Sequence, residues 1–188
     1  MSEAGEVKVD EKLDADAQAR RRAALAQIRQ YGDPALRMRA EEVERFDDDL
    51  ARLVERMTSL MRDAHGVGLA ANQAGILRRV VVVQPAADEE SHALVNPRIV
   101  ERSDDVATDD EGCLSLQGVL VPVERSVRVT VEAQDPRGAP VRVEFADLGA
   151  RVIQHEIDHL DGVLIVDLTT DESRREAMAV LRPRLVLG

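Results

Sequence analysis

Residues 155–159 read His-Glu-Ile-Asp-His, a stretch that predicts a helix around which the rest of the fold is packed. Side chains four residues apart lie on one face of an α-helix, so His155 and His159 can hold one metal ion. Glu156, beside them, can handle a proton of water bound to that ion. Two histidines leave a zinc-type site one protein ligand short, so the pattern requires a third ligand elsewhere in the chain.

The only cysteine of the chain, Cys113, lies in Glu111-Gly-Cys-Leu-Ser115. A lone cysteine is usually a small buried hydrophobic residue, whereas a thiolate beside two imidazoles suits zinc or ferrous iron. The alternatives are a surface pair of histidines and an ordinary helix-surface carboxylate at Glu156. The combination favours a metallohydrolase in which Cys113, His155 and His159 bind the metal and Glu156 is the general acid/base.

Composition limits the other possibilities. The 188 residues suit one domain, and a hydrophobic fraction of 44% with only 2% aromatic residues predicts an aliphatic core. A formal charge of −11 argues against general nucleic-acid binding. One cysteine cannot form an internal disulfide, which fits a reducing cytoplasm, and no apolar run approaches the roughly 20 residues of a membrane helix.

The chain divides into two regions by composition. Residues 1–19 are rich in acidic residues, lysine and alanine, and residues 1–24 are expected to be a disordered extension, with a short helix around 20–27 as an alternative. Residues 25–188 are expected to form a single catalytic domain.

Hydrophobic spacing predicts the elements of this domain. An amphipathic helix follows Asp47, because apolar residues recur from Leu50 to Met61 at helical spacing. Asp147 is predicted to cap the helix that carries His155. Strands are expected at 80–83, from 94 onward, and at 127–131 and 141–145, the last two as an antiparallel hairpin, with a final helix at 171–181. The fold class is therefore α+β, with antiparallel or mixed sheets around the second helix.

Three segments of the sequence resemble a known family. They are Gly66-Val-Gly-Leu-Ala-Ala-Asn-Gln73, Glu111-Gly-Cys-Leu-Ser115 and Gln154-His-Glu-Ile-Asp-His-Leu-Asp-Gly162. They resemble, in the same order, the three motifs of the bacterial peptide deformylases, and residues 28–36 resemble the opening segment of that family. The likeness covers about residues 28 to 168.

This resemblance implies a reaction and a set of roles. The family removes the formyl group from N-formylmethionine at the start of new polypeptides, releasing formate after metal-bound water attacks the formyl carbon. By motif position, Cys113, His155 and His159 bind the metal and Glu156 is the general acid/base. Gln73 and the backbone N–H of Leu114 are expected to stabilise the oxyanion, which makes them catalytic residues as well.

Substrate contacts are expected around the same residues. Gly66 and Gly68 permit a peptide to approach the backbone closely, although a helix-ending turn would also explain them. Val67, Leu148 and Val152 would line a pocket for the methionine side chain or, as an alternative, pack in the core. Two positions depart from expectation near this groove. Gln117 follows the cysteine motif where the family often has proline nearby, and Arg151 is polar, so it is expected to point outward.

The resemblance also implies a cofactor and partners. One divalent ion per chain is expected, usually Fe²⁺ in this family, with Zn²⁺, Ni²⁺ or Co²⁺ in purified protein. The partners would be nascent formyl-Met polypeptides and, transiently, the ribosome, in a bacterial-type cytoplasm, with no membrane and no specific nucleic acid. A metallopeptidase is the alternative enzyme. A non-catalytic module with a structural metal is the alternative outside enzymes, and it would need His65 or His92 as a fourth ligand.

Overall fold

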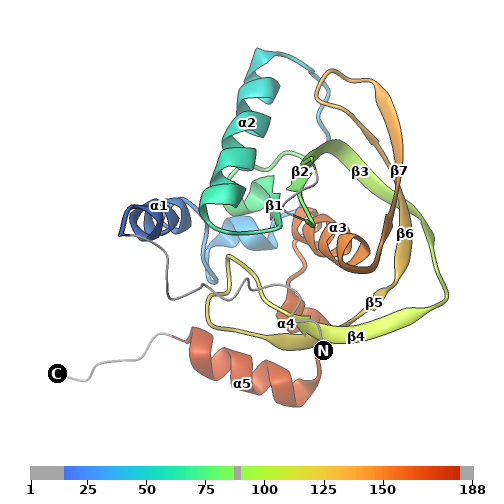
Figure 1. The fold of residues 1–188 in the computed structure, drawn as a ribbon. Helices are drawn as coiled ribbons and strands as arrows, with labels where there is room; N and C mark the ends of the chain where they lie inside the picture. Colours follow the sequence, from blue (N-terminus) through green and yellow to red (C-terminus); the bar gives the residue numbers. More distant parts are fainter. Residues whose placement is uncertain (1–14, 87–89, 183–188) are drawn as a thin grey trace.

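The computed structural model describes residues 15–86 and 90–182. Within these residues, a five-stranded sheet and a two-stranded sheet surround the helix α3 (Asp147–Leu160), which carries the His155–His159 stretch (Figure 1). This helix contacts all five strands of the larger sheet and also the smaller one. The predicted α+β class is confirmed.

Among the described residues, each pair of neighbouring strands is antiparallel. The larger sheet has the order β1-β2-β3-β6-β7 and comprises β1 (Gly68–Ala70), β2 (Val80–Val83), β3 (His92–Arg102), β6 (Arg128–Gln134) and β7 (Pro140–Ala146). The smaller sheet pairs β4 (Val106–Glu111) with β5 (Val121–Ser126). The predicted β6–β7 hairpin is confirmed, with Val131 opposite Val143.

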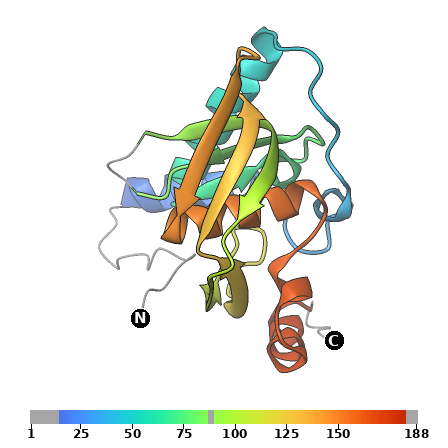
Figure 2. The ribbon, with the colours of Figure 1, turned by 90° about the vertical axis from the view of Figure 1, so that its right-hand side faces the viewer.

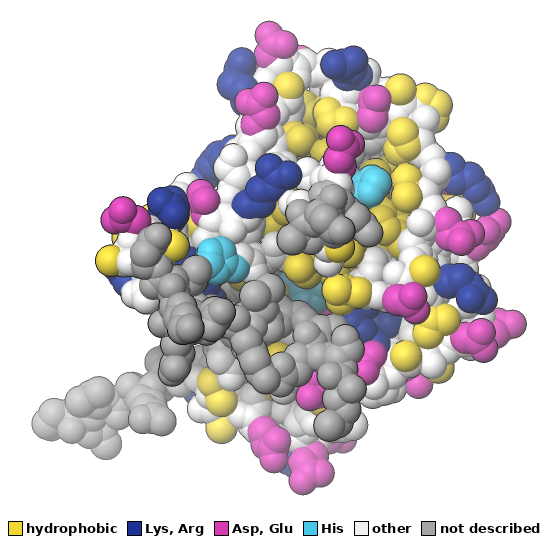
Figure 3. Space-filling view, in the orientation of Figure 1, with side chains coloured by type: hydrophobic (Ala, Val, Ile, Leu, Met, Phe, Trp, Pro, Cys, Tyr) yellow, Lys and Arg dark blue, Asp and Glu magenta, His cyan; other side chains and the backbone are white. Residues whose placement is uncertain are grey.

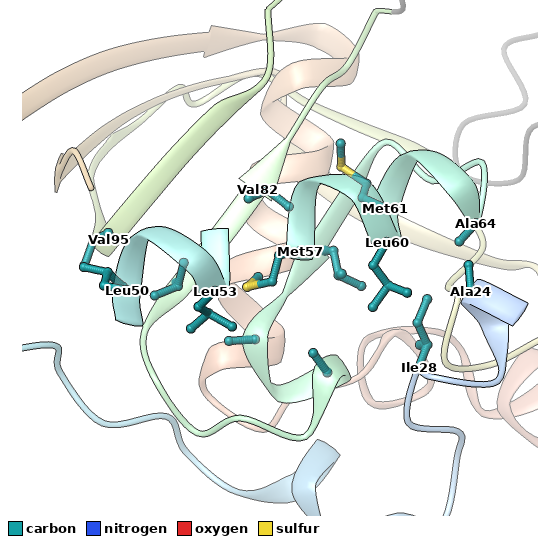
Figure 4. Packing of buried hydrophobic residues seen from close by; sticks show 14 of the residues in the cluster. Ala24, Ile28, Leu50, Leu53, Met57, Leu60, Met61, Ala64, Val82 and Val95 are labelled. Carbon is teal, nitrogen blue, oxygen red and sulfur yellow. The ribbon is translucent and has the colours of Figure 1, made fainter. Parts of the chain in front are cut away.

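The helix α2 (Asp48–Asp63) forms because its apolar residues recur on one face. Leu50, Leu53, Met57, Leu60 and Met61 are all buried, and Figure 4 shows side chains of this face beside Val82 and Val95 of the sheet. Asp47 caps the helix, its carboxylate accepting a hydrogen bond from Leu50 N at 3.2 Å. The predicted amphipathic helix is therefore confirmed.

The four valines of β2 show why this strand is apolar throughout. Val80 and Val82 belong to the hydrophobic cluster of α2, whereas Val81 and Val83 belong to that of α3. Alternate side chains of a strand point to opposite faces, so this part of the sheet lies between the two helices. Figure 2 shows α3 lying across the sheet.

The start of α3 differs from the prediction. Asp147 is the first helical residue, at φ 49°, and the N-cap is Ala146, with no side-chain hydrogen bond. The backbone N–H of Asp147 donates to Val127 O at 2.8 Å, which ties this turn to the sheet. Aspartate tolerates the left-handed region better than most residues, so it serves the sharp turn from β7 into α3 instead of capping.

The described part of the N-terminal extension is helical. Residues 1–14 of the expected disordered extension lie outside the described residues. Residues 15–24, expected to be disordered, form most of the helix α1 (Ala15–Leu25), in which Ala24 is buried against the cluster of α2. Five alanines among eleven residues favour a helix there.

The C-terminal part adds a third cluster of apolar side chains. It joins β5 to α4 (Ile165–Leu168) and α5 (Asp171–Leu181), and the prediction of this last helix is confirmed. A single-turn 3-10 helix, η1 (Pro34–Arg37), contributes Leu36 to the same cluster. Within the described residues, no helix combines the length and apolarity needed to cross a membrane.

Figure 3 shows charged side chains of both signs interspersed on the face that it displays, with hydrophobic side chains gathered between α2 and the β6–β7 hairpin. The described residues of this face form no continuous basic area. A face of this kind suits the net charge of −11 and offers little to a polyanion.

Candidate active site

Three side chains from two distant parts of the chain converge beside β4. Cys113 lies in the loop after that strand, and His155 and His159 lie one turn apart on α3. One ligand atom of each lies within 4.8 Å of the others. Cys113 Sγ is 3.3 Å from His159 Nε2, which is in turn 3.1 Å from His155 Nε2. The structure therefore brings together the three residues that the sequence singled out as ligands.

The donor set fits a divalent ion. A thiol and two imidazoles with their ring nitrogens facing one another suit zinc or ferrous iron. Burial, followed by the charge of His155, lowers the pKa of His159 well below 6.5, so this ring is held neutral. Neutral imidazole is the form that binds metals.

Glu111 fixes the orientation of His155. Its carboxylate lies 3.0 Å from His155 Nδ1, which leaves Nε2 to face Cys113 and His159. Glu111 also accepts hydrogen bonds from Arg125 at 2.8 and 3.0 Å. Burial alone would raise the pKa of Glu111. The hydrogen bonds from His155 and Arg125 outweigh burial, so the pKa of Glu111 lies far below the ordinary 4.5. A fixed negative charge thus orients the ring.

Arg151 does not point outward as expected. It is 6% exposed, and its guanidinium donates at 2.8 Å to Glu111, to Val123 O and to Ala107 O. The long side chain reaches from α3 to the β4–β5 hairpin, where carbonyl and carboxylate oxygens satisfy it. A buried arginine is tolerated when its donors are paired in this way.

Glu156 is buried without a complete set of partners. The residue is 4% exposed, and its Oε2 has no hydrogen-bond partner among the described residues. Burial, only partly opposed by the charge of His155, raises the pKa of Glu156 to about 7. A Cβ at position 68 would collide with this carboxyl group, so Gly68 is needed for its close approach.

Gln73 lies on the other side of Cys113. It belongs to the 3-10 helix η2 (Ala71–Ala74), and its Nε2 is 3.7 Å from Cys113 Sγ. Leu114 follows Cys113, and its side chain packs so tightly against Gly66 that a Cβ there would lie 2.7 Å from Leu114 Cδ1. Both residues therefore flank the thiol.

These residues share one cavity. Its lining includes all but one of the site residues predicted from the sequence: Gly66, Val67, Gly68, Gln73, Cys113, Leu114, Leu148, Val152, His155 and Glu156. The exception is His159, which is 1% exposed. Val152 is buried and Leu148 is 37% exposed, so Leu148 lies at the mouth. Gln117 is not part of the lining, and it donates to Gln30 Oε1 at 2.9 Å.

Several residues that shape the site had no role in the sequence analysis. Glu111 and Ser115 lie in a motif that assigns neither of them a role, and Arg125 lies in no motif and carries no local signal. The pairing of Glu111 with Arg125 spans 14 residues and that with Arg151 spans 40, so neither follows from helical or strand periodicity.

An α+β domain whose cavity holds a buried glutamate beside a Cys-His-His cluster is typical of the class of hydrolases that use a metal ion. Within that class the chain belongs to the polypeptide deformylase family, whose sequence pattern matches residues 25–175.

Two comparisons place it among known members. It is 44% identical over 149 residues to the peptide deformylase of Dictyoglomus turgidum, covering 79% of this chain and 95% of that protein. The corresponding protein of Natranaerobius thermophilus is 43% identical over 153 residues, covering 81% of this chain and 97% of the relative.

Solved structures give the same result. The peptide deformylase of Thermotoga maritima superposes with a TM-score of 0.73 at 44% identity, covering 76% of this chain and 96% of that one. That of Legionella pneumophila gives a TM-score of 0.78 at 39% identity, covering 82% and 91%. The chain is therefore an enzyme of the deformylase type, and its family consists of metalloenzymes that remove N-formyl groups from new peptides.

Proposed function

We propose that this enzyme hydrolyses the formyl amide of N-terminal formylmethionine, with Cys113, His155 and His159 as ligands of one divalent ion. The observation that carries the proposal is their convergence, within 4.8 Å, on a cavity that also contains Glu156. A bound Fe²⁺ or Zn²⁺ would supply a Lewis acid that makes water nucleophilic near neutral pH. The thiolate suits either ion.

Glu156 would carry the proton during this reaction. A carboxyl group with a pKa near 7 can both accept a proton from the attacking water and return it to the leaving amine. Its partly unsatisfied, buried carboxyl group supports this role, because a structural carboxylate would have its oxygens paired.

Two donors would stabilise the oxyanion formed from the formyl carbonyl. They are Gln73 Nε2 and the backbone N–H of Leu114, which flank Cys113. Removal of one such donor typically lowers kcat by about 10² to 10³.

The substrate residue next to the formyl group would contact the apolar part of the cavity. Val67, Leu148 and Val152 supply that surface, with Gly66 and Gly68 leaving room for the peptide backbone. An unbranched thioether side chain suits such a pocket, because methionine adapts to irregular apolar surfaces.

The cavity supports a catalytic metal over a structural one. The three-residue cluster includes neither His65 nor His92, and two of its members line an open cavity. A structural site would be closed by a fourth protein ligand. His92 instead packs edge-on against Phe145, with ring centroids 5.7 Å apart.

The proposal is tested with Glu156→Gln, which keeps the shape of the side chain but cannot carry the proton. We expect kcat on a formyl-Met peptide to fall at least about 100-fold, with the metal content of the protein unchanged. Unchanged turnover would refute the role of Glu156. For the unmodified enzyme, equal turnover of acetyl-capped and formyl-capped peptides would refute the formyl specificity.

The partners of the reaction follow from its substrate. We propose that the enzyme acts in the cytoplasm on chains still leaving the ribosome, touching the ribosome only transiently. Arginines near the C-terminus, among them Arg175 and Arg182, are candidates for that contact. Reversing their charge would weaken co-sedimentation with ribosomes without changing turnover of short peptides, and unchanged co-sedimentation would reject them.

A further inference from the structure

Ser115 contacts both sides of the site without lining the cavity. It is fully buried, at 0% exposure, and its Oγ lies 3.2 Å from Gln73 Nε2. Its backbone N–H donates to Cys113 Sγ at 3.4 Å. A small polar residue thus joins the carboxamide of Gln73 to the loop that carries the thiol.

The hydrogen bonds of Gln73 determine which way its amide faces. Gln73 Oε1 accepts from the backbone N–H of Ala70 at 2.9 Å, and a backbone N–H can only donate. The NH₂ group therefore faces the opposite way, where one proton goes to Ser115 Oγ. The second proton faces Cys113, whose Sγ accepts from Nε2 over a long 3.7 Å. The Ser115 hydroxyl is thus the closer acceptor, and it aims this second proton at the side of the thiol.

The terminal torsion of a glutamine is otherwise loosely defined. Rotations about a bond to a planar amide have broad, roughly two-fold energy profiles. Without the hydroxyl, only the Ala70 contact and the long contact to Cys113 Sγ would oppose rotation of the Gln73 amide about its oxygen. The shorter bond to Ser115 Oγ restricts this rotation, so the hydroxyl sets the angle at which the amide meets the cavity.

The separation of the two loops does not depend on that hydroxyl. Residues 29–31 connect them through the backbone. Arg29 N donates to Gln73 O at 2.7 Å, and Tyr31 N donates to Ser115 O at 2.8 Å. The side chain of Gln30 adds a bond to Leu114 O at 3.1 Å. Deletion of the hydroxyl should therefore leave the backbone of both loops in place and change only the orientation of the amide.

We propose that Ser115 is a positioning residue, which holds the Gln73 amide in the orientation that presents one N–H to the reacting carbonyl oxygen. The inference rests on the proposed function, in which Gln73 stabilises the oxyanion. The Ser115 side chain belongs neither to the lining of the cavity nor to the Cys-His-His cluster. Its effect on the reaction passes entirely through Gln73.

A double-mutant cycle tests this dependence. Ser115→Ala, Gln73→Ala and the double variant are compared on a formyl-Met peptide, with metal content measured for each. We expect Ser115→Ala to lower kcat about tenfold, the equivalent of one net hydrogen bond, with KM within about twofold and metal content unchanged. In the Gln73→Ala background the same substitution should have no further effect, because its only route of action is gone.

Two further variants serve as controls. Ser115→Thr retains an acceptor oxygen and should return kcat to within about threefold of the unmodified enzyme. Thr130→Val deletes another buried hydroxyl, on β6, which donates to Glu101 Oε2 of β3 at 3.0 Å, and this variant should leave kcat unchanged.

Each remaining outcome overturns the proposal in a recognisable way. An equal loss of kcat from Ser115→Ala in both backgrounds would mean a structural role, as would loss of metal. An unchanged kcat in Ser115→Ala, with Gln73→Ala impaired, would reject the positioning role alone. Full activity of Gln73→Ala would reject the oxyanion role of Gln73 in the proposed function and the positioning role with it.

Discussion

At the level of single residues, the Glu111 carboxylate takes part in four hydrogen bonds. His155 contributes one, Arg125 two and Arg151 one. An ionised carboxylate is acceptor-only and can take several donors at once. The same charge that fixes the His155 ring therefore also satisfies two buried guanidinium groups, so ligand geometry and packing depend on one side chain.

Glu111→Gln should weaken metal binding without unfolding the protein. An amide keeps an acceptor oxygen but loses the charge, and loss of such an outer partner typically lowers metal affinity about 10- to 100-fold. Competition with a chelator would measure the change. Glu124→Gln on the exposed side of β5 is the matched control and should bind metal normally. Equal affinity of the two variants would contradict this role of Glu111.

Residue spacing explains which parts of the site were predictable. His155 and His159 lie four residues apart on one helix, and the lone Cys113 was the candidate for the missing ligand. The partners of Glu111 and the link from Gln73 to Ser115 are different, because they join residues 14 to 44 positions apart in the sequence. Such contacts depend on the tertiary fold, and no periodic pattern in the sequence predicts them.

At the level of elements, α3 and the β4–β5 hairpin are held together by Arg151. Its guanidinium reaches the backbone of both strands, at Ala107 O and Val123 O. Cys113 follows directly after β4, so the position of the hairpin relative to α3 also determines where the thiol meets the histidines.

Arg151→Met should therefore be strongly destabilising. The substitution keeps an unbranched side chain but leaves a buried carboxylate and two carbonyl oxygens short of a donor. We expect a loss of about 2–4 kcal/mol in the free energy of unfolding, measured with denaturant. Arg128→Met is the control, since Arg128 is 58% exposed and 3.9 Å from Asp105, and it should cost below about 0.5 kcal/mol. A loss below about 0.5 kcal/mol in the free energy of unfolding of Arg151→Met would show that the hairpin keeps its position without Arg151.

Asp167 makes a second link between elements, and this link depends on pH. It accepts from Leu164 N at 2.8 Å at the start of α4, and it pairs with Arg37 at the end of η1. Partial burial alone would raise the pKa of Asp167. The hydrogen bonds from Arg37 and Leu164 outweigh burial, so the pKa of Asp167 lies below the ordinary 3.8.

The sign of the effect follows from that direction. A carboxyl group with a depressed pKa in the folded state stabilises the fold above its unfolded pKa, and this stabilisation is lost as pH falls below it. Asp167→Asn should therefore reduce stability at pH 7 and flatten the loss of stability between neutral pH and pH 3. Thermal melts across that range would measure it, and parallel pH profiles for the two proteins would contradict it.

The elements that could be predicted are those with a clean hydrophobic pattern. The helix with Leu50 to Met61, the four valines of β2 and the β6–β7 hairpin all follow from spacing. The strand β4 reads Val-Ala-Thr-Asp-Asp-Glu and escaped prediction, because three acidic residues outweigh its one β-branched apolar residue. The strand exists because β5 pairs with it and Arg151 binds its backbone.

At the level of the whole molecule, the ligands of the metal come from two separately packed regions. His155 and His159 lie on the helix enclosed by the larger sheet, whose cluster includes Ile153 and Leu160. Cys113 packs at the edge of the third cluster, with β5, α4 and α5. An ion bound by all three side chains would therefore connect two regions that otherwise meet through side-chain contacts such as those of Arg151.

Metal removal should for this reason lower the melting temperature of the whole domain. A ligand that binds only the folded state stabilises it according to its concentration relative to Kd, by about 4 kcal/mol at 1,000 times Kd. For a chain of this size, each kcal/mol corresponds to about 2–4 °C, so chelation should lower Tm by roughly 8–16 °C, and added Zn²⁺ should restore it. His159→Ala should melt near the chelated protein and respond to neither treatment. A Tm that stays constant after the loss of metal is verified by elemental analysis would mean that the two regions are joined without the ion, and that the three side chains serve chemistry alone.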